Sequence, residues 1–170
     1  YSSNTSYYDR TVCSYGCSSW SEPGRDAVHS FTTSYIQSNI TAALSNMSAD
    51  LDVFILQNNQ CDSSGCMAGD SSATYPYAPR GTHYIVVDGF YSAPVSNCEF
   101  TALGAEGPYT LTVTEQCIVA KSLTPGEVYS GETNGGPPSG ANSYSCTGWN
   151  ESGPEVIHSV ATTTTGDLTA

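Results

Sequence analysis

An internal repeat is the feature that most constrains what this chain can fold into. Aligned without a gap, residues 14–31 and residues 143–160 are identical at eight of eighteen positions. Chance is a poor explanation, because the rare residues cysteine and tryptophan recur at the same spacing. Self-similarity of this kind indicates that one structural unit is copied along the chain. The identical pairs are Ser14/Ser143, Tyr15/Tyr144, Cys17/Cys146, Trp20/Trp149, Glu22/Glu151, Gly24/Gly153, His29/His158 and Ser30/Ser159.

The repeat also indicates how the chain is divided. The similarity extends forward with one gap, where SNITA at 38–42 resembles GDLTA at 166–170. It extends backward too, where YSSNTS at Tyr1 resembles YSGETN at Tyr129. Glycine and proline, typical of linkers, are frequent between the copies. The expected segments are a complete unit at 1–121 (unit one), a Gly/Pro-rich linker at 122–142 and the opening strands of a second, incomplete unit at 143–170 (the second opening).

Unit one carries five segments rich in β-branched and aromatic residues between turn residues, which predicts strands. Two of them alternate apolar and other residues with period two, which predicts a buried face and a solvated face. No helical pattern of ten residues is found. We therefore expect an all-β fold, an antiparallel β-sandwich of the Ig-like or jelly-roll kind with about seven to nine strands. The predicted strands are Ala27–Thr33, Asn39–Leu44, Leu51–Gln57, His83–Val87 and Tyr109–Thr114.

Charge and cysteine content restrict the partners and the location of the chain. Sixteen acidic residues against four basic ones give a net charge of −12, so nucleic acid and anionic membrane surfaces are poor partners. No apolar run reaches about 18 residues, so we expect no membrane insertion. Seven scattered cysteines in a lysine-poor chain favour disulfides, and therefore an extracellular or cell-surface location with Tyr1 as a processed N-terminus.

Several motifs occur in an order that resembles a known family. These are AVHSFTT, NITAALS, ADLDVFIL, CDSSGC, GTHYIVVDGF and GPYTLTV, spread over residues 14–114. Together they resemble the bacterial pre-peptidase C-terminal domain, in the cysteine-containing tandem form of secreted and surface proteins. The resemblance implies a β-sandwich without an active site of its own. The chain departs from the family at Gly24–Asp26, which reads GRD instead of GPE, and in a long loop from Tyr91 to Pro108.

Unit one contains six cysteines, an even number, so all of them can be paired in disulfides. Cys61 and Cys66 enclose four residues, so we expect them to bridge locally. Cys13 and Cys98 are additions to the family pattern, which suggests that they pair with each other, and Cys17 would then pair with Cys117. The alternative is a Cys117–Cys146 bridge across the linker, which would leave Cys17 for a preceding unit.

Three further groups of residues are candidate sites. Asp50, Asp52 and Asp88, with Asp26 or Glu22, could supply carboxylates to Ca²⁺, although solvated acids at strand edges explain them equally. The sequence contains no catalytic motif of the GxSxG, HExxH or SxxK kind, so we expect no enzyme. His29 and His158 recur inside strands and are interpreted as structural. N-glycosylation sequons begin at Asn4, Asn39, Asn46 and Asn150.

These observations favour a non-catalytic extracellular building block, structural or adhesive, that shares strands with other copies of itself in a filament or surface array. The second opening presents apolar residues that a fragment of its size cannot bury alone. The alternative is an accessory domain of a secreted hydrolase that binds a matrix protein such as collagen, or a polysaccharide. The residues expected to take part in assembly are Val156, Ile157, Val160 and Leu168, which match Ala27, Val28, Phe31 and Ile40 of unit one.

Overall fold

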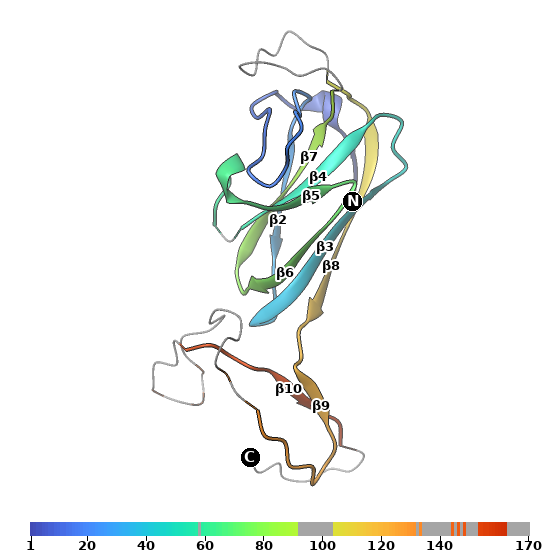
Figure 1. Cartoon of the computed structure of the whole chain (residues 1–170). Coiled ribbons are helices and arrows are strands. Elements are labelled where there is room, and N and C mark those ends of the chain that lie inside the picture. The colour runs from blue at the N-terminus through green and yellow to red at the C-terminus, as the bar shows by residue number, and fades with distance from the viewer. Residues whose placement is uncertain are drawn as a thin grey trace.

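Two four-stranded antiparallel sheets pack face to face in the computed structural model, as Figure 1 shows. The residues that it describes are 1–57, 59–91, 104–131, 133, 144, 146, 148 and 153–162. The first sheet has the order β1 (Ser2–Asn4), β8 (Pro108–Cys117), β3 (Gln37–Ser45) and β6 (Ser72–Pro79). The second has the order β2 (Ala27–Thr32), β7 (Thr82–Gly89), β4 (Leu51–Leu56) and β5 (Cys66–Asp70). The prediction of an all-β antiparallel sandwich is confirmed.

The core lies between the two sheets and follows the predicted alternation. On β8, Tyr109 and Leu111 point inward and are buried, whereas Thr112 between Leu111 and Val113 is exposed. Burial of such apolar side chains is the main favourable term in folding. The buried core residues are Ala27, Ile40, Ala42, Leu51, Val53, Ile55, Ala73, Ala78, Ile85, Val87, Tyr109 and Leu111.

The outer faces of the two sheets differ. The first sheet presents threonine hydroxyls to solvent, and Thr41 on β3 lies level with both Thr74 on β6 and Thr114 on β8. The second sheet is covered instead, because Phe54 is fully buried and stacks on Tyr15 with ring centroids 3.8 Å apart. The expectation of one solvated face per sheet therefore holds for the first sheet and is wrong for the second.

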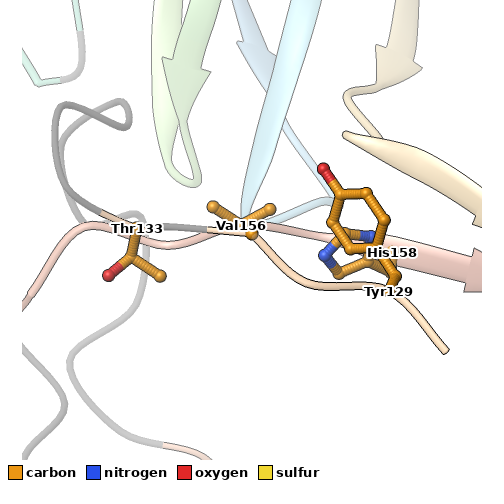
Figure 2. Close-up of a pocket in the computed structure, with 5 residues that line it drawn as sticks. Tyr129, Thr133, Val156 and His158 are labelled. Atoms are coloured by element: carbon orange, nitrogen blue, oxygen red, sulfur yellow. The ribbon is translucent and has the colours of Figure 1, made fainter.

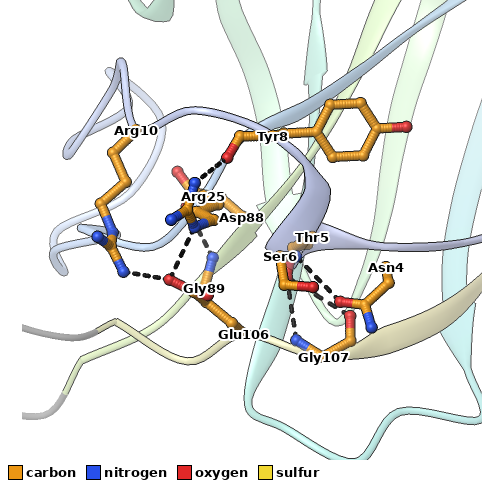
Figure 3. Close-up of polar contacts among 10 residues, drawn as sticks. All are labelled: Asn4, Thr5, Ser6, Tyr8, Arg10, Arg25, Asp88, Gly89, Glu106 and Gly107. Atoms are coloured by element: carbon orange, nitrogen blue, oxygen red, sulfur yellow. Dashed lines mark hydrogen bonds and ion pairs between the residues drawn. The ribbon is translucent and has the colours of Figure 1, made fainter.

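The segment before β2 covers that second sheet and is fixed by polar contacts, as Figure 3 shows. The guanidinium groups of Arg10 and Arg25 both pair with the carboxylate of Glu106. Gly24, which recurs in the repeat as Gly153, lies where a Cβ would come within 2.6 Å of the Gly89 backbone. This close approach explains why the position takes glycine.

Three strands of unit one were not predicted. β1 has three residues, and β5 contains Gly69, which disfavours a strand prediction. β6 contains Pro76, a residue that cannot donate to a central ladder. The structure resolves the conflict because β6 lies at the edge of the first sheet. Proline is tolerated at an edge, where the missing N–H leaves no ladder bond unmade.

A separate pair of short strands lies beyond the end of β8 (Figure 1). β9 (Lys121–Leu123) pairs in parallel with β10 (His158–Val160). β9 occupies residues that were expected to belong to the end of unit one and the start of the linker. In the described part of the chain, no helix is long and apolar enough to cross a membrane.

Candidate functional site

The junction between unit one and the second opening is the first candidate site. The Ala120 N–H donates to the Ile157 carbonyl at 2.6 Å. The hydroxyl groups of Ser122 and Ser159 lie 2.8 Å apart. Strand β10 of the second opening is therefore paired, and within this chain its partner is β9.

Aromatic and cationic side chains complete this junction. The rings of Tyr129 and His158 meet edge to face with centroids 5.0 Å apart, and Figure 2 shows them side by side. The Lys121 ammonium lies 4.9 Å from the centre of the Tyr129 ring, within cation–π distance. Together with Val156 and Thr133, the two rings line a cavity of about 280 Å³.

Unit one contains the same ring pair at the matching positions. Tyr1 and His29 meet edge to face with centroids 4.7 Å apart. Here the His29 Nε2 also lies 2.9 Å from the Tyr109 hydroxyl of β8. Burial, with the nearby N-terminal ammonium, lowers the pKa of His29. The YSSNTS/YSGETN match aligns Tyr1 with Tyr129, but nothing in that pattern shows that each tyrosine contacts a histidine.

The residues expected to take part in assembly are only partly accessible. Val156 and Ile157 are half-buried, and Val160 is 41% exposed. Leu168 lies outside the described residues. Of the four matching positions in unit one, Ala27 and Ile40 are fully buried and Phe31 is half-buried, whereas Val28 is 45% exposed and faces outward on β2. Ile157 thus matches an outward position, whereas Val156 matches the fully buried Ala27.

The disulfides differ from the expected pairs. Cys17 is bonded to Cys66 with a Cα–Cα distance of 5.3 Å, and Cys61 is free. The local Cys61–Cys66 prediction is therefore wrong. The physical reason is that the Gly16 N–H donates to the Ser63 carbonyl at 3.1 Å, which brings Cys17 onto this loop.

Cys117 is also free, so its predicted bond to Cys17 is wrong. Cys17 packs over the outer face of the second sheet, whereas Cys117 ends β8 in the first sheet. Cys146 is free as well, which removes the alternative bridge across the linker. Cys13 is disulfide-bonded, and Cys98, the partner expected for it, lies outside the described residues.

Buried carboxyl groups form a second candidate site beneath the N-terminal segment. Asp26 accepts hydrogen bonds from the Thr11 hydroxyl at 2.7 Å and from the Val12 N–H at 3.0 Å. Asp88 is fully buried and accepts a bond of 2.9 Å from the Tyr15 hydroxyl. Burial, and after it the neighbouring Asp26, raises the pKa of Asp88 well above its usual value.

Glu22 and Asp52 form a similar pair nearby. Glu22 is fully buried, and burial, followed by the charge of Asp52, raises its pKa to about 9. Both carboxyl oxygens of Glu22 are buried without a hydrogen-bond partner among the described residues. Asp52, Asp50 and Asp70 also line a cavity of about 280 Å³.

The structure thus divides the predicted calcium ligands between two places. Asp50 and Asp52 lie at the cavity, while the carboxylates of Asp26 and Asp88 are engaged by hydroxyl and backbone N–H groups. No group of three or more His, Cys, Asp or Glu side chains among the described residues is arranged to hold a metal ion. Calcium binding therefore stays a prediction.

The predicted glycosylation sites have different surroundings. Asn4 is half-buried, and its side chain accepts a hydrogen bond of 2.9 Å from the Ser6 N–H. Asn39 is half-buried on β3. Asn46 is exposed in the turn after β3, and Asn150 lies outside the described residues. Asn46 therefore offers the most accessible sequon of the three that the structure describes.

Comparison with family models, with curated proteins and with solved structures finds no match for this chain.

Proposed function

We propose that this chain is a non-catalytic extracellular building block, structural or adhesive, that assembles with other copies into a filament or surface array. The second opening exchanges partners in this assembly, so that its strand in one copy pairs with the β9 strand of another. The resemblance to tandem pre-peptidase C-terminal domains and the Cys17–Cys66 disulfide support a secreted location.

The observation that carries the proposal is the poor shielding of the second opening. Its strand β10 has three residues, and Val160 on it remains 41% exposed. The linker residue Tyr129, whose ring contacts His158, is 45% exposed. The matching strand of unit one instead packs in a sandwich, where Ala27 is fully buried. A three-residue strand with an exposed valine gains free energy by pairing with a further copy.

The test is sedimentation velocity over a concentration series, with electron microscopy of the same samples. We expect larger species to grow with concentration in the native chain. Val160→Asp places a charge on the exposed apolar side chain and should abolish the larger species that form by exchange of β10. Met47→Asp adds the same charge to an exposed loop residue of unit one and should assemble like the native chain.

Monomers of the native chain at every concentration would contradict the assembly. Co-sedimentation of such monomers with insoluble collagen or polysaccharide would support the accessory-domain alternative instead. Both outcomes are read from the same protein preparation.

A further inference from the structure

Strand β2 forms an open edge of the second sheet. Within the described residues, only β7 pairs with it. The Thr33 N–H donates to the Gly81 carbonyl at 2.9 Å. Because backbone groups alternate sides along an antiparallel strand, the N–H and C=O groups of Val28, Ser30 and Thr32 point away from β7. Unpaired groups in such a row are a template for another strand.

The second opening has the same edge, and there it is occupied. The Ile157 carbonyl accepts the Ala120 N–H, and the Ser159 hydroxyl contacts Ser122 of β9. Ile157 and Ser159 are the repeat counterparts of Val28 and Ser30. The backbone edge that β9 covers in the second opening is therefore the edge that β2 leaves open in unit one.

The tyrosine that contacts the lysine of β9 also has a counterpart in unit one. In the second opening the Lys121 ammonium lies over the Tyr129 ring, which contacts His158. In unit one Tyr1 contacts His29 in the same way, and Tyr1 is 68% exposed. An exposed aromatic ring is thus already in place for a cation beside the open edge.

A cavity beside β2 is suited to Leu123, the other side chain on the same face of β9 as Lys121. Lys121 and Leu123 are both half-buried and share one face of β9, and Leu123 pairs with Val160. The counterpart of Val160 is Phe31, which lines a cavity of about 280 Å³ in unit one. The other lining residues are Tyr1, His29, Ser30, Ile85, Leu111 and Val113. This mostly apolar lining suits a leucine.

We propose that the open edge of β2 accepts the β9 strand of a second copy of this chain, in the parallel register that β9 has with β10. A second copy is the occupant that the contacts support, because residues 120–123 already bind a repeat of this site. The proposal rests on the proposed assembly for its partner, but the acceptor site can be tested separately.

One consequence is competition between two acceptors for one strand. Each chain carries β9 once and presents both β10 and the β2 edge. The β10 of the same chain acts at an effective concentration of about millimolar, which holds β9 in place in dilute solution. Docking on β2 is therefore expected to increase with concentration, or when the β9–β10 pair is weakened.

The acceptor is tested with a synthetic peptide of sequence IVAKSLTP, residues 118–125, titrated into the isotope-labelled full chain. We expect amide shifts at Val28, Ser30 and Thr32 and a shift of the Tyr1 ring. Ser30→Pro removes an outward N–H without touching the β2–β7 ladder and should weaken binding by roughly tenfold or more. Ser30→Ala keeps the N–H and should bind as the native chain does.

A second variant covers the case in which Ser30→Pro does not fold. Tyr1→Ala removes the exposed ring and should weaken the peptide about two- to fivefold, since an exposed cation–π contact is small. Peptide shifts that avoid β2, or that persist unchanged in Ser30→Pro, would overturn the acceptor.

Self-association of the full chain separates this proposal from the proposed function. Ser159→Pro weakens the β9–β10 pair, so β9 becomes available and association through β2 should increase. Adding Ser30→Pro should abolish that increase. If Ser159→Pro abolishes association and Ser30→Pro leaves it intact, sharing through β10 stands and docking on β2 is wrong. If the peptide binds β2 but no chain associates, the proposed assembly is wrong and the acceptor stands.

Discussion

Unit one and the second opening carry the same motif in different surroundings. His29 contacts Tyr1 and is hydrogen-bonded to Tyr109, whereas the matching His158 contacts Tyr129 and is exposed. The ring pair is therefore a local property of the repeated sequence. The burial is not local, since it comes from β8 and β7, and the described residues contain no counterpart of these strands for the second opening.

The matching tyrosines, Tyr15 and Tyr144, also share a local contact but differ in their surroundings. The Tyr15 hydroxyl donates to Asp88 on β7 at 2.9 Å. Its counterpart Tyr144 donates at 2.6 Å to Glu155, which matches Asp26. With no β7 carboxyl in reach, the hydroxyl bonds to the acid that its own repeat supplies. The repeat thus encodes a tyrosine–acid contact, and the completed sandwich selects which acid takes part.

Replacing the matching cysteines is expected to show the largest difference in unfolding free energy between the two regions. Replacing both Cys17 and Cys66 by alanine removes a bond that closes a loop with a sequence separation of 49 residues. We expect unit one to lose roughly 2–4 kcal/mol of unfolding free energy. Cys146→Ala changes a free, exposed cysteine and should alter stability by less than about 0.5 kcal/mol. Denaturant titration measures both, and equal losses would contradict the comparison.

The tyrosine pair should show the next largest effect. Tyr15→Phe removes the hydroxyl that donates to the buried Asp88, and an unsatisfied buried acceptor costs about 1–3 kcal/mol. Tyr144→Phe affects a contact in a partly exposed region and should cost less than about 0.5 kcal/mol. Thermal unfolding of the two variants compares them directly. A larger loss for Tyr144→Phe would show that the second opening is the better-packed region.

The dependence of stability on pH should also come mainly from carboxyl groups of unit one. The folded-state pKa values of Glu22, Asp52 and Asp88 are raised, mainly by burial. The folded chain therefore holds more protons than the unfolded chain above pH about 4.5, and stability falls as pH rises towards the Glu22 pKa of about 9. We expect Tm to drop by several degrees between pH 5 and pH 9. Glu22→Gln removes one of these carboxyls and should flatten the profile, whereas an unchanged profile would exclude Glu22 as a cause.

Calcium is expected to give the smallest effect. The candidate ligands are divided between the cavity at Asp50 and Asp52 and the buried Asp26 and Asp88, which accept hydrogen bonds from Val12 and Tyr15. We expect Tm to differ little between chelator and millimolar Ca²⁺. A clear rise in Tm with Ca²⁺ that is lost in Asp50→Asn would restore the calcium site and extend the contrast between the two regions.

Much of the sandwich follows from sequence pattern, because period-two alternation reports which side of a strand is buried. That alternation marks β4 and β8, whereas β3 and β7 were predicted from their β-branched and aromatic content between turn residues. β6 was missed because Pro76 is acceptable only at an edge, and position in a sheet cannot be read from composition. Phe54 was assigned to a solvated face because nothing local shows that the segment around Tyr15 folds over it.

The candidate sites were less predictable, since they depend on contacts distant in sequence. Cys61 and Cys66 are neighbours in sequence, yet a backbone bond from Gly16 brings Cys17 to Cys66 instead. Cysteine spacing gives no information on such a loop contact. The carboxyl pairs are similar, because Glu22 and Asp52 are 30 residues apart and meet only when the sheets have formed.

The parallel pairing of β9 with β10 has a geometric consequence of its own. When the last strand of one unit pairs in parallel with the first strand of the next unit, all units in the assembly point in the same direction. Contacts of this kind are heterologous, so repetition gives a screw axis instead of a closed dimer unless the rotation completes a ring. The two ends of such a fibre differ, because one end carries an open β2 edge and the other carries a β9 strand that has no acceptor. Growth would then proceed at different rates at its two tips.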